Sequence, residues 1–277
     1  MQPKQIHPWF RNVFLLGCLL SFIAGLQLFF LSEQTETYFA WTIQSRLTAA
    51  TLGGFYFGSM TFGLLSAREK LWARVRGPAL GLLVFTSVSL AATLLHLDKF
   101  HLDSQNWLTL TATRSWLAIY ILLPPALALS MIVQGRLPGA DLDRTTGFPT
   151  WFRFILTLRG VAVILTALAL FFVPQAILPF WPWSLTPLTA RALSAWLVSF
   201  GALDLHALLE NDWQRVKVMS VSFIVSALFA FIALIRYSDE ANLLGLGGLL
   251  YVVYLLSMLG FGIYGWRKAG LDERKTK

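Results

Sequence analysis

The sequence predicts an all-α integral membrane protein whose eight transmembrane helices form two parallel four-helix repeats, related by a pseudo-twofold axis along the membrane normal. Three observations lead to this prediction: the composition, the recurrence of long apolar stretches, and an internal similarity between the two halves. Of the 277 residues, 56% are hydrophobic and 13% are charged, whereas a soluble domain carries roughly 25% charged residues. The mean hydropathy of +0.64 agrees with a membrane protein.

Apolar stretches long enough to span a bilayer recur along the whole chain. A helix crosses the roughly 30 Å of hydrocarbon with about 20 apolar residues. Strands of a membrane barrel would alternate apolar and polar residues, but the segment VAVILTALALFFV shows no such alternation. We therefore expect helices at residues 12–32, 45–67, 77–97, 113–134, 152–173, 188–210, 216–237 and 243–266.

The distribution of Lys and Arg predicts the orientation of these helices. If the N-terminus is cytoplasmic, most of the positive charge falls in cytoplasmic segments such as AREKLWARVRG, ENDWQRVK and WRKAGLDERKTK. The opposite segments hold Glu33, Glu36, Asp98, Asp103, Asp239 and Glu240. Because positive residues are enriched in cytoplasmic loops, we expect a multi-pass protein of the cell membrane with both termini in the cytoplasm.

The net charge of +8 does not require a nucleic-acid partner. Orientation of the helices and contact with anionic lipid headgroups account for it, and no nucleic-acid-binding motif accompanies it. The expected partner is the lipid bilayer, and a membrane-protein partner or a homo-oligomer stays open. The single cysteine, Cys18, excludes an intramolecular disulfide and a cysteine-based metal site. No motif indicates which cofactor, if any, the chain binds.

The two halves of the chain resemble each other in one register. At an offset of 142 residues, Trp9-Phe10-Arg11 meets Trp151-Phe152-Arg153. One residue is then lost, and at an offset of 141 LTAATL meets LTARAL. The same offset places Glu69, Trp72, Arg74, Val75 and Asp98 on Glu210, Trp213, Arg215, Val216 and Asp239. A register kept through three helices predicts an internal duplication.

The duplication divides the chain into a first repeat at residues 1–135, a cytoplasmic linker at 136–150 and a second repeat at 151–277. Four helices bring each repeat back to the side on which it started, so the repeats are parallel. We therefore expect residues 9–98 to superpose on residues 151–239 after a rotation of about half a turn around the membrane normal.

Glycines indicate where helices approach each other closely. The pair Gly54 and Gly58, four residues apart in the second predicted helix, fits the small-residue pattern of packed membrane helices. We expect this pattern to serve packing.

Polar residues at the outer ends of several helices form a candidate ligand-binding cluster. The third predicted helix brings His96 and Asp98 to the outer boundary after about 20 residues. The candidate residues are Arg46, His96, Asp98, His101, Arg114 and Asp239. Two alternatives stay open: helix ends lying among lipid headgroups, or a pocket for a ligand or headgroup. A metal site is not expected, because the spacing of the histidines and carboxylate matches no familiar ligand set.

Three further candidates lie inside the membrane. Arg159 in the fifth helix and Asp204 in the sixth both lie on the order of 10 Å from the inner boundary at 1.5 Å per residue, so we predict a direct or water-bridged ion pair. Their counterparts in the first repeat are Gly17 and Gly63. The pair either fixes the two helices or belongs to a substrate or proton path. His206 is expected to face elsewhere, as a possible proton site or axial ligand.

The motifs of common soluble enzymes are missing from the sequence. It contains no Walker loop, no HExxH, no GxSxG and no nucleotide-binding glycine pattern. This argues against an enzyme, although an intramembrane reaction stays open. The sequence favours a small-molecule or ion transporter, or ligand-binding membrane protein, with its site near the repeat interface. The alternative is a non-catalytic scaffold or cofactor-holding subunit of a larger membrane complex.

Overall fold

The computed structural model describes residues 2–275, with side chains described as far as residue 272, as a bundle of long helices. The eight helices of 20 or more residues are α1 (Pro8–Phe30), α3 (Arg46–Arg68), α4 (Arg76–Leu95), α5 (Trp107–Arg136), α6 (Thr150–Phe172), α8 (Pro187–Glu210), α9 (Trp213–Arg236) and α10 (Leu246–Lys275). Short α-helices, α2 (Thr35–Tyr38) and α7 (Pro174–Ile177), and 3-10 turns, η1 (Trp72–Arg74), η2 (Leu97–Lys99), η3 (Leu178–Phe180) and η4 (Ser238–Glu240), join them.

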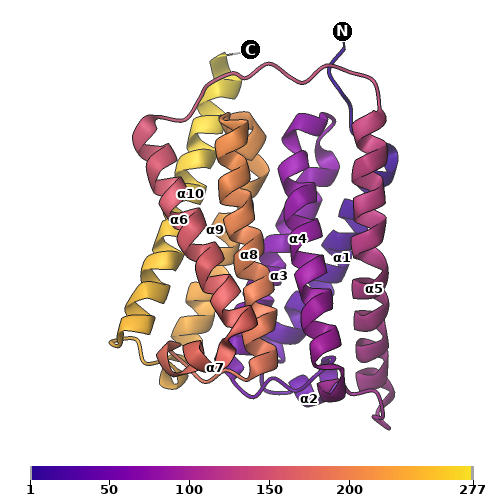
Figure 1. Cartoon of the computed structure of the whole chain (residues 1–277), viewed down its shortest axis with the longest axis vertical. Coiled ribbons are helices and arrows are strands. Elements are labelled where there is room, and N and C mark those ends of the chain that lie inside the picture. Colours follow the sequence, from indigo (N-terminus) through magenta and orange to yellow (C-terminus); the bar gives the residue numbers. More distant parts are fainter. Residues whose placement is uncertain (1, 276–277) are drawn as a thin grey trace.

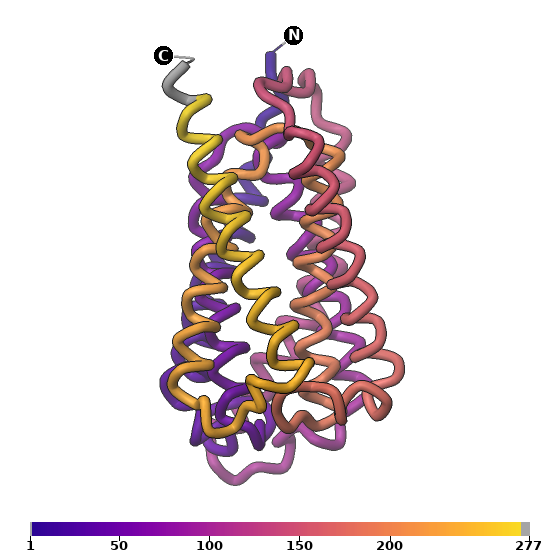
Figure 2. The backbone as a smooth tube through the Cα atoms, turned by 90° about the vertical axis from the view of Figure 1, so that its left-hand side faces the viewer, coloured from indigo at the N-terminus to yellow at the C-terminus, as the bar shows by residue number. Residues whose placement is uncertain are grey.

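The long helices run side by side along one axis (Figure 1). Both ends of the chain lie at the same end of the bundle, as the view turned by 90° also shows (Figure 2). The segment between α5 and α6 crosses the bundle there, and we call this end the termini end. The short helices α2 and α7 lie at the opposite end, which we call the loop end.

Seven of the described helices are long and apolar enough to cross a membrane, which supports a multi-pass membrane protein. The eighth long helix, α3, is not among them although it has 23 residues. It lies in the interior, where it packs against α1 and α9, and most of its residues are buried. An interior helix gains from small residues that allow close packing, and Gly, Ala, Ser and Thr lower its hydropathy.

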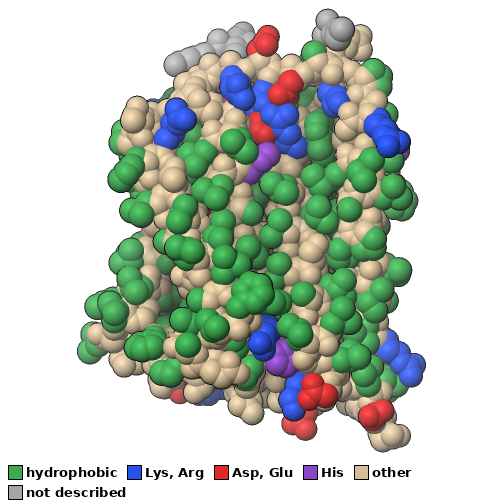
Figure 3. All heavy atoms as spheres, viewed as in Figure 1, with side chains coloured by type: hydrophobic (Ala, Val, Ile, Leu, Met, Phe, Trp, Pro, Cys, Tyr) green, Lys and Arg blue, Asp and Glu red, His purple; other side chains and the backbone are tan. Residues whose placement is uncertain are grey.

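The surface agrees with contact to lipid. Charged side chains gather at the two ends of the bundle, and the middle carries mainly hydrophobic side chains (Figure 3). The helices α1, α5, α6 and α10 are buried over only 22% to 33% of their apolar windows, against 44% to 61% for α4, α8 and α9. The helices α1, α5, α6 and α10 therefore form the outer ring. A helix with exposed apolar side chains is the form that hydrocarbon accepts, because its backbone polar groups are satisfied within the segment.

Glycines hold α3 close to its two neighbours, as the small-residue pattern predicted. A Cβ atom on Gly53 would lie 2.5 Å from the backbone nitrogen of Phe29 on α1. A Cβ atom on Gly58 would lie 1.8 Å from the hydroxyl oxygen of Ser226 on α9. Both distances are below van der Waals contact, so a larger residue at either position requires a shift of the neighbour.

The contacts between helices follow the division into two halves, which we call the first unit (α1 to α5) and the second unit (α6 to α10). Within the units, α1 packs on α3 and α4 on α5, as α6 packs on α8 and α9 on α10. Between the units, α3 packs on α9 and α8 on α4. If α1, α3, α4 and α5 are matched with α6, α8, α9 and α10, each of these contacts between two helices has an equivalent contact between their counterparts. The duplication stays a prediction that this packing favours.

Several helix boundaries differ from those expected from the sequence: α1 begins at Pro8, and α10 runs from Leu246 to Lys275. Two further differences affect candidate residues. The predicted helix at 77–97 ends at Leu95, so Asp98 lies in the 3-10 turn η2. The predicted helix at 113–134 is longer, because the Asn106 side chain accepts a hydrogen bond from the Leu108 amide (3.0 Å) and starts α5 at Trp107. Arg114, which the predicted range placed at the start of this helix, therefore lies about two turns inside α5.

We predict that Gly53→Ala lowers the stability of the protein and that Gly17→Ala does not. The added methyl group on Gly53 meets the backbone of α1 and has no flexible atom to displace, whereas a Cβ on Gly17 meets nothing within 4 Å. Overpacking of this kind costs about 1–3 kcal/mol. The measurement is the midpoint of SDS-induced unfolding of the purified variants in detergent micelles. Equal midpoints for the two variants would contradict the close packing of α1 and α3.

Candidate functional site

A charged cluster at the loop end joins the two units around Arg46 at the start of α3. Its guanidinium donates hydrogen bonds to Glu240 Oε1 (2.6 Å) and to Asp239 Oδ2 (2.8 Å), both from η4. The second oxygen of Glu240 accepts from the Ser45 hydroxyl (2.7 Å) and the Leu47 amide (3.1 Å). The carboxylate of Glu240 therefore caps the first turn of α3, a position where negative charge is favoured.

This capping changes the acidity of Glu240. Burial acts to raise its pKa, but the hydrogen bonds from Ser45, Arg46 and the Leu47 amide lower the pKa below its ordinary value. The contact therefore contributes stability above the ordinary glutamate pKa, and this contribution is lost as the pH falls through the lower folded value.

A second contact at the loop end pairs Arg191 of α8 with His96, the residue after α4. Arg191 Nη1 lies 2.7 Å from His96 Nε2, and its Nε donates to the carbonyl oxygen of Phe171 (2.9 Å). Burial, followed by the charge of Arg191, lowers the pKa of His96 below its ordinary value. The imidazole is therefore neutral at neutral pH and can accept the hydrogen bond from the guanidinium.

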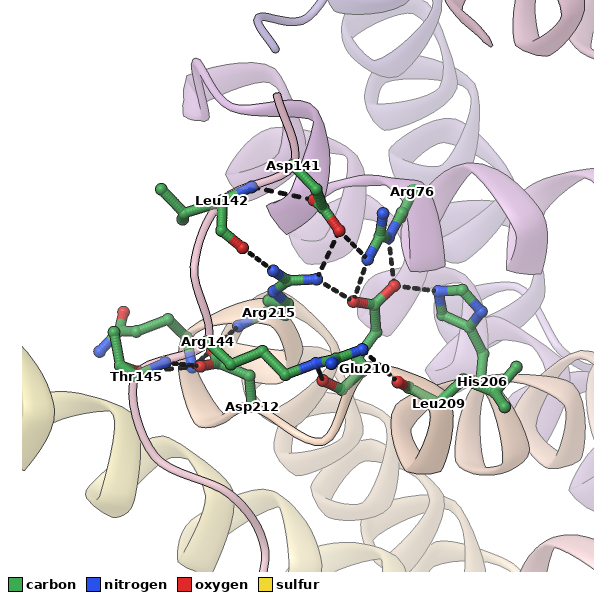
Figure 4. A network of polar contacts seen from close by, with 11 residues as sticks. Arg76, Asp141, Leu142, Arg144, Thr145, His206, Leu209, Glu210, Asp212 and Arg215 are labelled. Carbon is green, nitrogen blue, oxygen red and sulfur yellow. Dashed lines mark hydrogen bonds and ion pairs between the residues drawn. The ribbon is translucent and has the colours of Figure 1, made fainter. Parts of the chain in front are cut away.

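A charged cluster at the termini end is centred on Glu210, the last residue of α8 (Figure 4). Its carboxylate accepts hydrogen bonds from Nε and Nη2 of Arg76, which begins α4, and from Arg215 Nη1 (2.7 Å). His206 Nε2, one turn earlier on α8, lies 3.0 Å from Glu210 Oε1. The Glu210 side chain is 4% exposed, and such a buried carboxylate is stable only because these donors surround it.

The linker between the units closes over this cluster (Figure 4). Asp141 Oδ2 lies 3.1 Å from Arg76 Nη2 and 3.2 Å from Arg215 Nη1, so one carboxylate bridges both units. Burial acts to raise the pKa of Asp141, but the two guanidinium groups lower the pKa below its ordinary value. Arg144 donates to the carbonyl oxygens of Leu209 (3.2 Å) and Glu210 (2.9 Å) at the end of α8.

Part of this cluster has a counterpart in the first unit. Arg74 Nη1 lies 3.3 Å from Glu69 Oε2, and these residues match Arg215 and Glu210 in the internal alignment. The same five-residue spacing joins the end of one helix to the start of the next in each case. The arginine that follows each of the matched tryptophans, Trp72 and Trp213, therefore forms an ion pair in both units.

A cavity lies between the units, midway along α3, α4, α8 and α9. Four serines line it: Ser59, Ser199, Ser222 and Ser226. Aromatic rings complete the wall: Phe85, Trp196, Phe200 and Phe223. Ser199 donates its hydroxyl hydrogen to the carbonyl oxygen of Gly81 (2.8 Å), which holds α8 against α4. The cavity combines an apolar wall with a few hydroxyl groups, and its volume of about 40 Å³ is enough for water in this closed conformation.

The predicted ion pair between Arg159 and Asp204 is present. Arg159 Nη2 donates a hydrogen bond to Asp204 Oδ1, and both side chains are buried. The guanidinium also lies between the rings of Phe223 (5.0 Å) and Phe261 (4.8 Å). His206 lies two residues after Asp204, on the other side of α8, and contacts Glu210. It therefore faces elsewhere, as expected. Its Nε2 is engaged by a carboxylate of the same helix.

The predicted outer cluster is only partly brought together. Arg46 and Asp239 are in contact, but the other members have separate partners. Asp98 pairs with its neighbour Lys99 at 3.0 Å. His101 contacts the Thr42 hydroxyl (3.0 Å) and the carbonyl oxygen of Phe39 (3.2 Å). Arg114 is exposed on α5. Ligand binding by this set stays a hypothesis.

Sequence reasoning missed the residues that complete both clusters: Arg76, Asp141, Arg191, Glu210, Arg215 and Glu240. One signal could have found two of them. Glu210 and Arg215 repeat Glu69 and Arg74 at the same spacing, and a carboxylate and a guanidinium retained together in both units predict a pair. The other members come from different units, so only the packing between the units brings them together.

Comparisons with known proteins identify no relative. No family model matches the chain, and neither a curated protein nor a solved structure matches it.

We predict that Asp204→Asn destabilises the protein and that the double change Arg159→Leu with Asp204→Leu largely restores it. The single change leaves a buried guanidinium without its counter-charge, which costs about 3–5 kcal/mol, whereas removing both charges leaves none unpaired. The measurement is SDS-induced unfolding of the single and double variants. A double variant no more stable than Asp204→Asn would show that the two charges do not offset each other.

Proposed function

We propose that this protein is a carrier that moves a small hydrogen-bonding solute or an ion across the cell membrane by opening alternately at the two ends of the interface between its units. One observation carries this proposal. Charged contacts between the units close the interface at the loop end and at the termini end, and the serine-lined cavity lies between them.

Contacts of this kind are suited to opening. Water can solvate Arg46 and its carboxylate partners when they separate, because the Arg46 side chain is already 39% exposed. Exposed ion pairs contribute little net stability, so the loss of this loop-end contact is a small barrier. The termini-end contact is more buried at Glu210, so opening there costs more.

Close backbone approaches occur within the units, as of α1 to Gly53, and also between them, as of α9 to Gly54. In this proposal the contact of α3 with α9 is kept and serves as the pivot between the units. Each unit can therefore move as a body while the end contacts break.

The expected arrangement as parallel repeats supports the same mechanism. Carriers built from parallel repeats place the substrate at the repeat interface and rock one repeat against the other. The cavity receives residues from α3 and α4 of the first unit and from α8 and α9 of the second. In this proposal all eight long helices span the membrane, with α3 shielded from lipid, and the termini end faces the cytoplasm.

The lining of the cavity indicates the class of solute. Ser199 and Ser222 donate their hydrogens to backbone carbonyl oxygens, so their hydroxyl oxygens can only accept hydrogen bonds from a solute. The aromatic rings of the wall can contact an apolar group or hold a cation over a ring face. A small solute with hydroxyl or amine groups fits this chemistry.

The orientation is tested by cysteine labelling in intact cells. In a Cys18→Ser background, we predict that cysteines at Glu36 and Gln105 react with a membrane-impermeant thiol reagent and that one at Asp141 does not. All three positions are exposed in the bundle, so a difference in labelling reports the side of the membrane. Labelling of the Asp141 position in intact cells would reverse the proposed orientation.

Alternating opening is tested at the cavity. Ser226 is 2% exposed, so Ser226→Cys in the Cys18→Ser background is expected to label slowly from either side. Adding Arg46→Ala removes the contact at the loop end, and we predict faster labelling from outside. Adding Arg76→Gln weakens the contact at the termini end, and we predict faster labelling from inside in inverted vesicles.

The matched control for these variants is Lys99→Ala. It removes an ion pair at the loop end that lies within η2 and does not join the units. Its labelling should equal that of the parent. Labelling of Ser226→Cys that stays slow in every properly folded variant would favour the alternative, a scaffold or cofactor-holding subunit with a fixed interface.

A further inference from the structure

Several buried polar atoms of the second unit, and one on the adjoining helix α3 of the first unit, lack a hydrogen-bond partner among residues 2–275. They are Thr51 Oγ1, Arg159 Nε, Asp204 Oδ2, and the hydroxyl oxygens of Tyr251 and Tyr254. Leaving such an atom unsatisfied costs on the order of 1–3 kcal/mol. Buried polar groups of this kind are usually satisfied by ordered water. A group of five in one region therefore indicates a hydrated path through the unit.

These atoms are connected to one another. The Tyr254 hydroxyl interacts electrostatically with Arg159, Asp204 and Tyr251. Tyr251 lies one turn closer to the loop end on α10, and its hydroxyl lies near that of Thr51 on α3 without a hydrogen bond between them. Residues three apart on a helix lie on one face. The path therefore leads from Asp204 along α10 towards the loop end.

The path is closed towards the termini end by aromatic side chains. The Arg159 guanidinium is held between the rings of Phe223 and Phe261. Phe152 packs on Phe261 (5.2 Å) and on Trp213 (5.0 Å), one layer further towards that end. The hydroxyl group among these rings, that of Ser220, donates its hydrogen to the carbonyl oxygen of Val216 (2.9 Å), so it forms no chain of hydroxyl groups to Arg159. Access to Asp204 through polar groups is therefore from the loop end.

At the loop end the path meets two tryptophans. The rings of Trp181 and Trp183 lie 6.2 Å and 4.9 Å from that of Tyr251. Trp183 Nε1 donates to the Thr48 hydroxyl (2.8 Å), one turn from Thr51 on α3. The indole of Trp181 adds another buried nitrogen with no partner in the described chain. Hydrogen-bonding groups thus continue from Tyr251 to the end of the bundle.

The surroundings of Asp204 leave one of its oxygens available. Arg159 of α6 engages Oδ1, and Tyr254 of α10 faces the pair. From α9, the ring of Phe223 packs against the guanidinium of Arg159. On α8 itself, His206 is turned to Glu210, which in turn holds Arg76 of α4. The guanidinium keeps its contacts with two aromatic rings whether or not Asp204 is charged.

We propose that Asp204 is a proton-binding site supplied from the loop end through water bound along Thr51, Tyr251 and Tyr254. A proton from a hydronium ion in this path forms an O–H bond at Asp204 Oδ2, and the hydronium becomes water. No other bond changes. This inference rests on the proposed carrier function only in assigning the proton a coupling role, because uptake at Asp204 would alter the contact between α6 and α8 next to the cavity wall at Phe223.

The test is infrared difference spectroscopy of the purified protein in lipid vesicles. As the pH is lowered towards the limit of folding, a protonated-carboxyl band should appear in the parent and be lost in Asp204→Asn. The folded double variant Arg159→Leu with Asp204→Leu should lack it too, which covers the case in which the single variant unfolds. The proposal would be overturned if the band persists in either folded variant. It would also be overturned if the parent shows no such band.

The route is tested by exchange of that carboxyl hydrogen for deuterium. Tyr254→Phe removes a hydroxyl on the proposed path, and exchange should slow by about tenfold, as expected for the loss of one hydrogen bond. Tyr264→Phe is the matched control, because Tyr264 lies on the same helix beyond the aromatic rings, beside Phe152 and Trp213. Equal slowing by both changes would contradict the route.

The two proposals fail separately. If Asp204 titrates but labelling of Ser226→Cys does not change in the Arg46 and Arg76 variants, the proton site is supported and the carrier function is contradicted. If labelling of Ser226→Cys alternates between the two sides but Asp204 does not titrate, the carrier function is supported and the proton site is contradicted.

Discussion

Close packing of α3 against α1 on one side and α9 on the other is the contact on which the rest of the structure depends. It joins the outer ring to the interior and the first unit to the second. Glycines at the contact let the backbones approach to distances that exclude a side chain. Helices in a bilayer gain nothing from hiding leucine from lipid, so this close van der Waals contact is what holds them together. The charged contacts at the two ends depend on it, because it sets the distance from Arg46 to η4.

The sequence was sufficient for the helices and for the ion pair inside the membrane. Apolar stretches of about 20 residues are a strong signal, and Arg159 and Asp204 lie at matching depths on consecutive helices. It was insufficient where contacts join the units. Arg46 and Glu240 are far apart in the chain, and no periodicity states that α3 lies beside α9. His96 was expected in the last turn of a helix at 77–97 with Asp98 directly after it, but α4 ends at Leu95 and the following turn directs them to different partners.

The two units differ most where one of them holds charge. At the positions of Arg159 and Asp204 the first unit has Gly17 and Gly63. A Cβ on Gly63 would lie 2.7 Å from the carbonyl oxygen of Phe14, so α1 and α3 are joined there by their backbones. In the second unit, α6 and α8 are joined at this level by side chains and by the rings around them. A backbone contact has one arrangement, whereas a contact between ionisable side chains has a charged and a neutral form.

The linker that crosses the termini end makes the two ends of the bundle unequal. Asp141 lies on the segment that connects the units, between Arg76 and Arg215, so it stays near both guanidinium groups after the contact breaks. A tethered group acts at an effective concentration set by its tether, commonly in the millimolar range for short flexible segments. No covalent segment between the units crosses the loop end within the described residues. In the carrier mechanism that we propose, reclosure is therefore faster at the termini end, and in the absence of a solute the protein spends more of its time closed there.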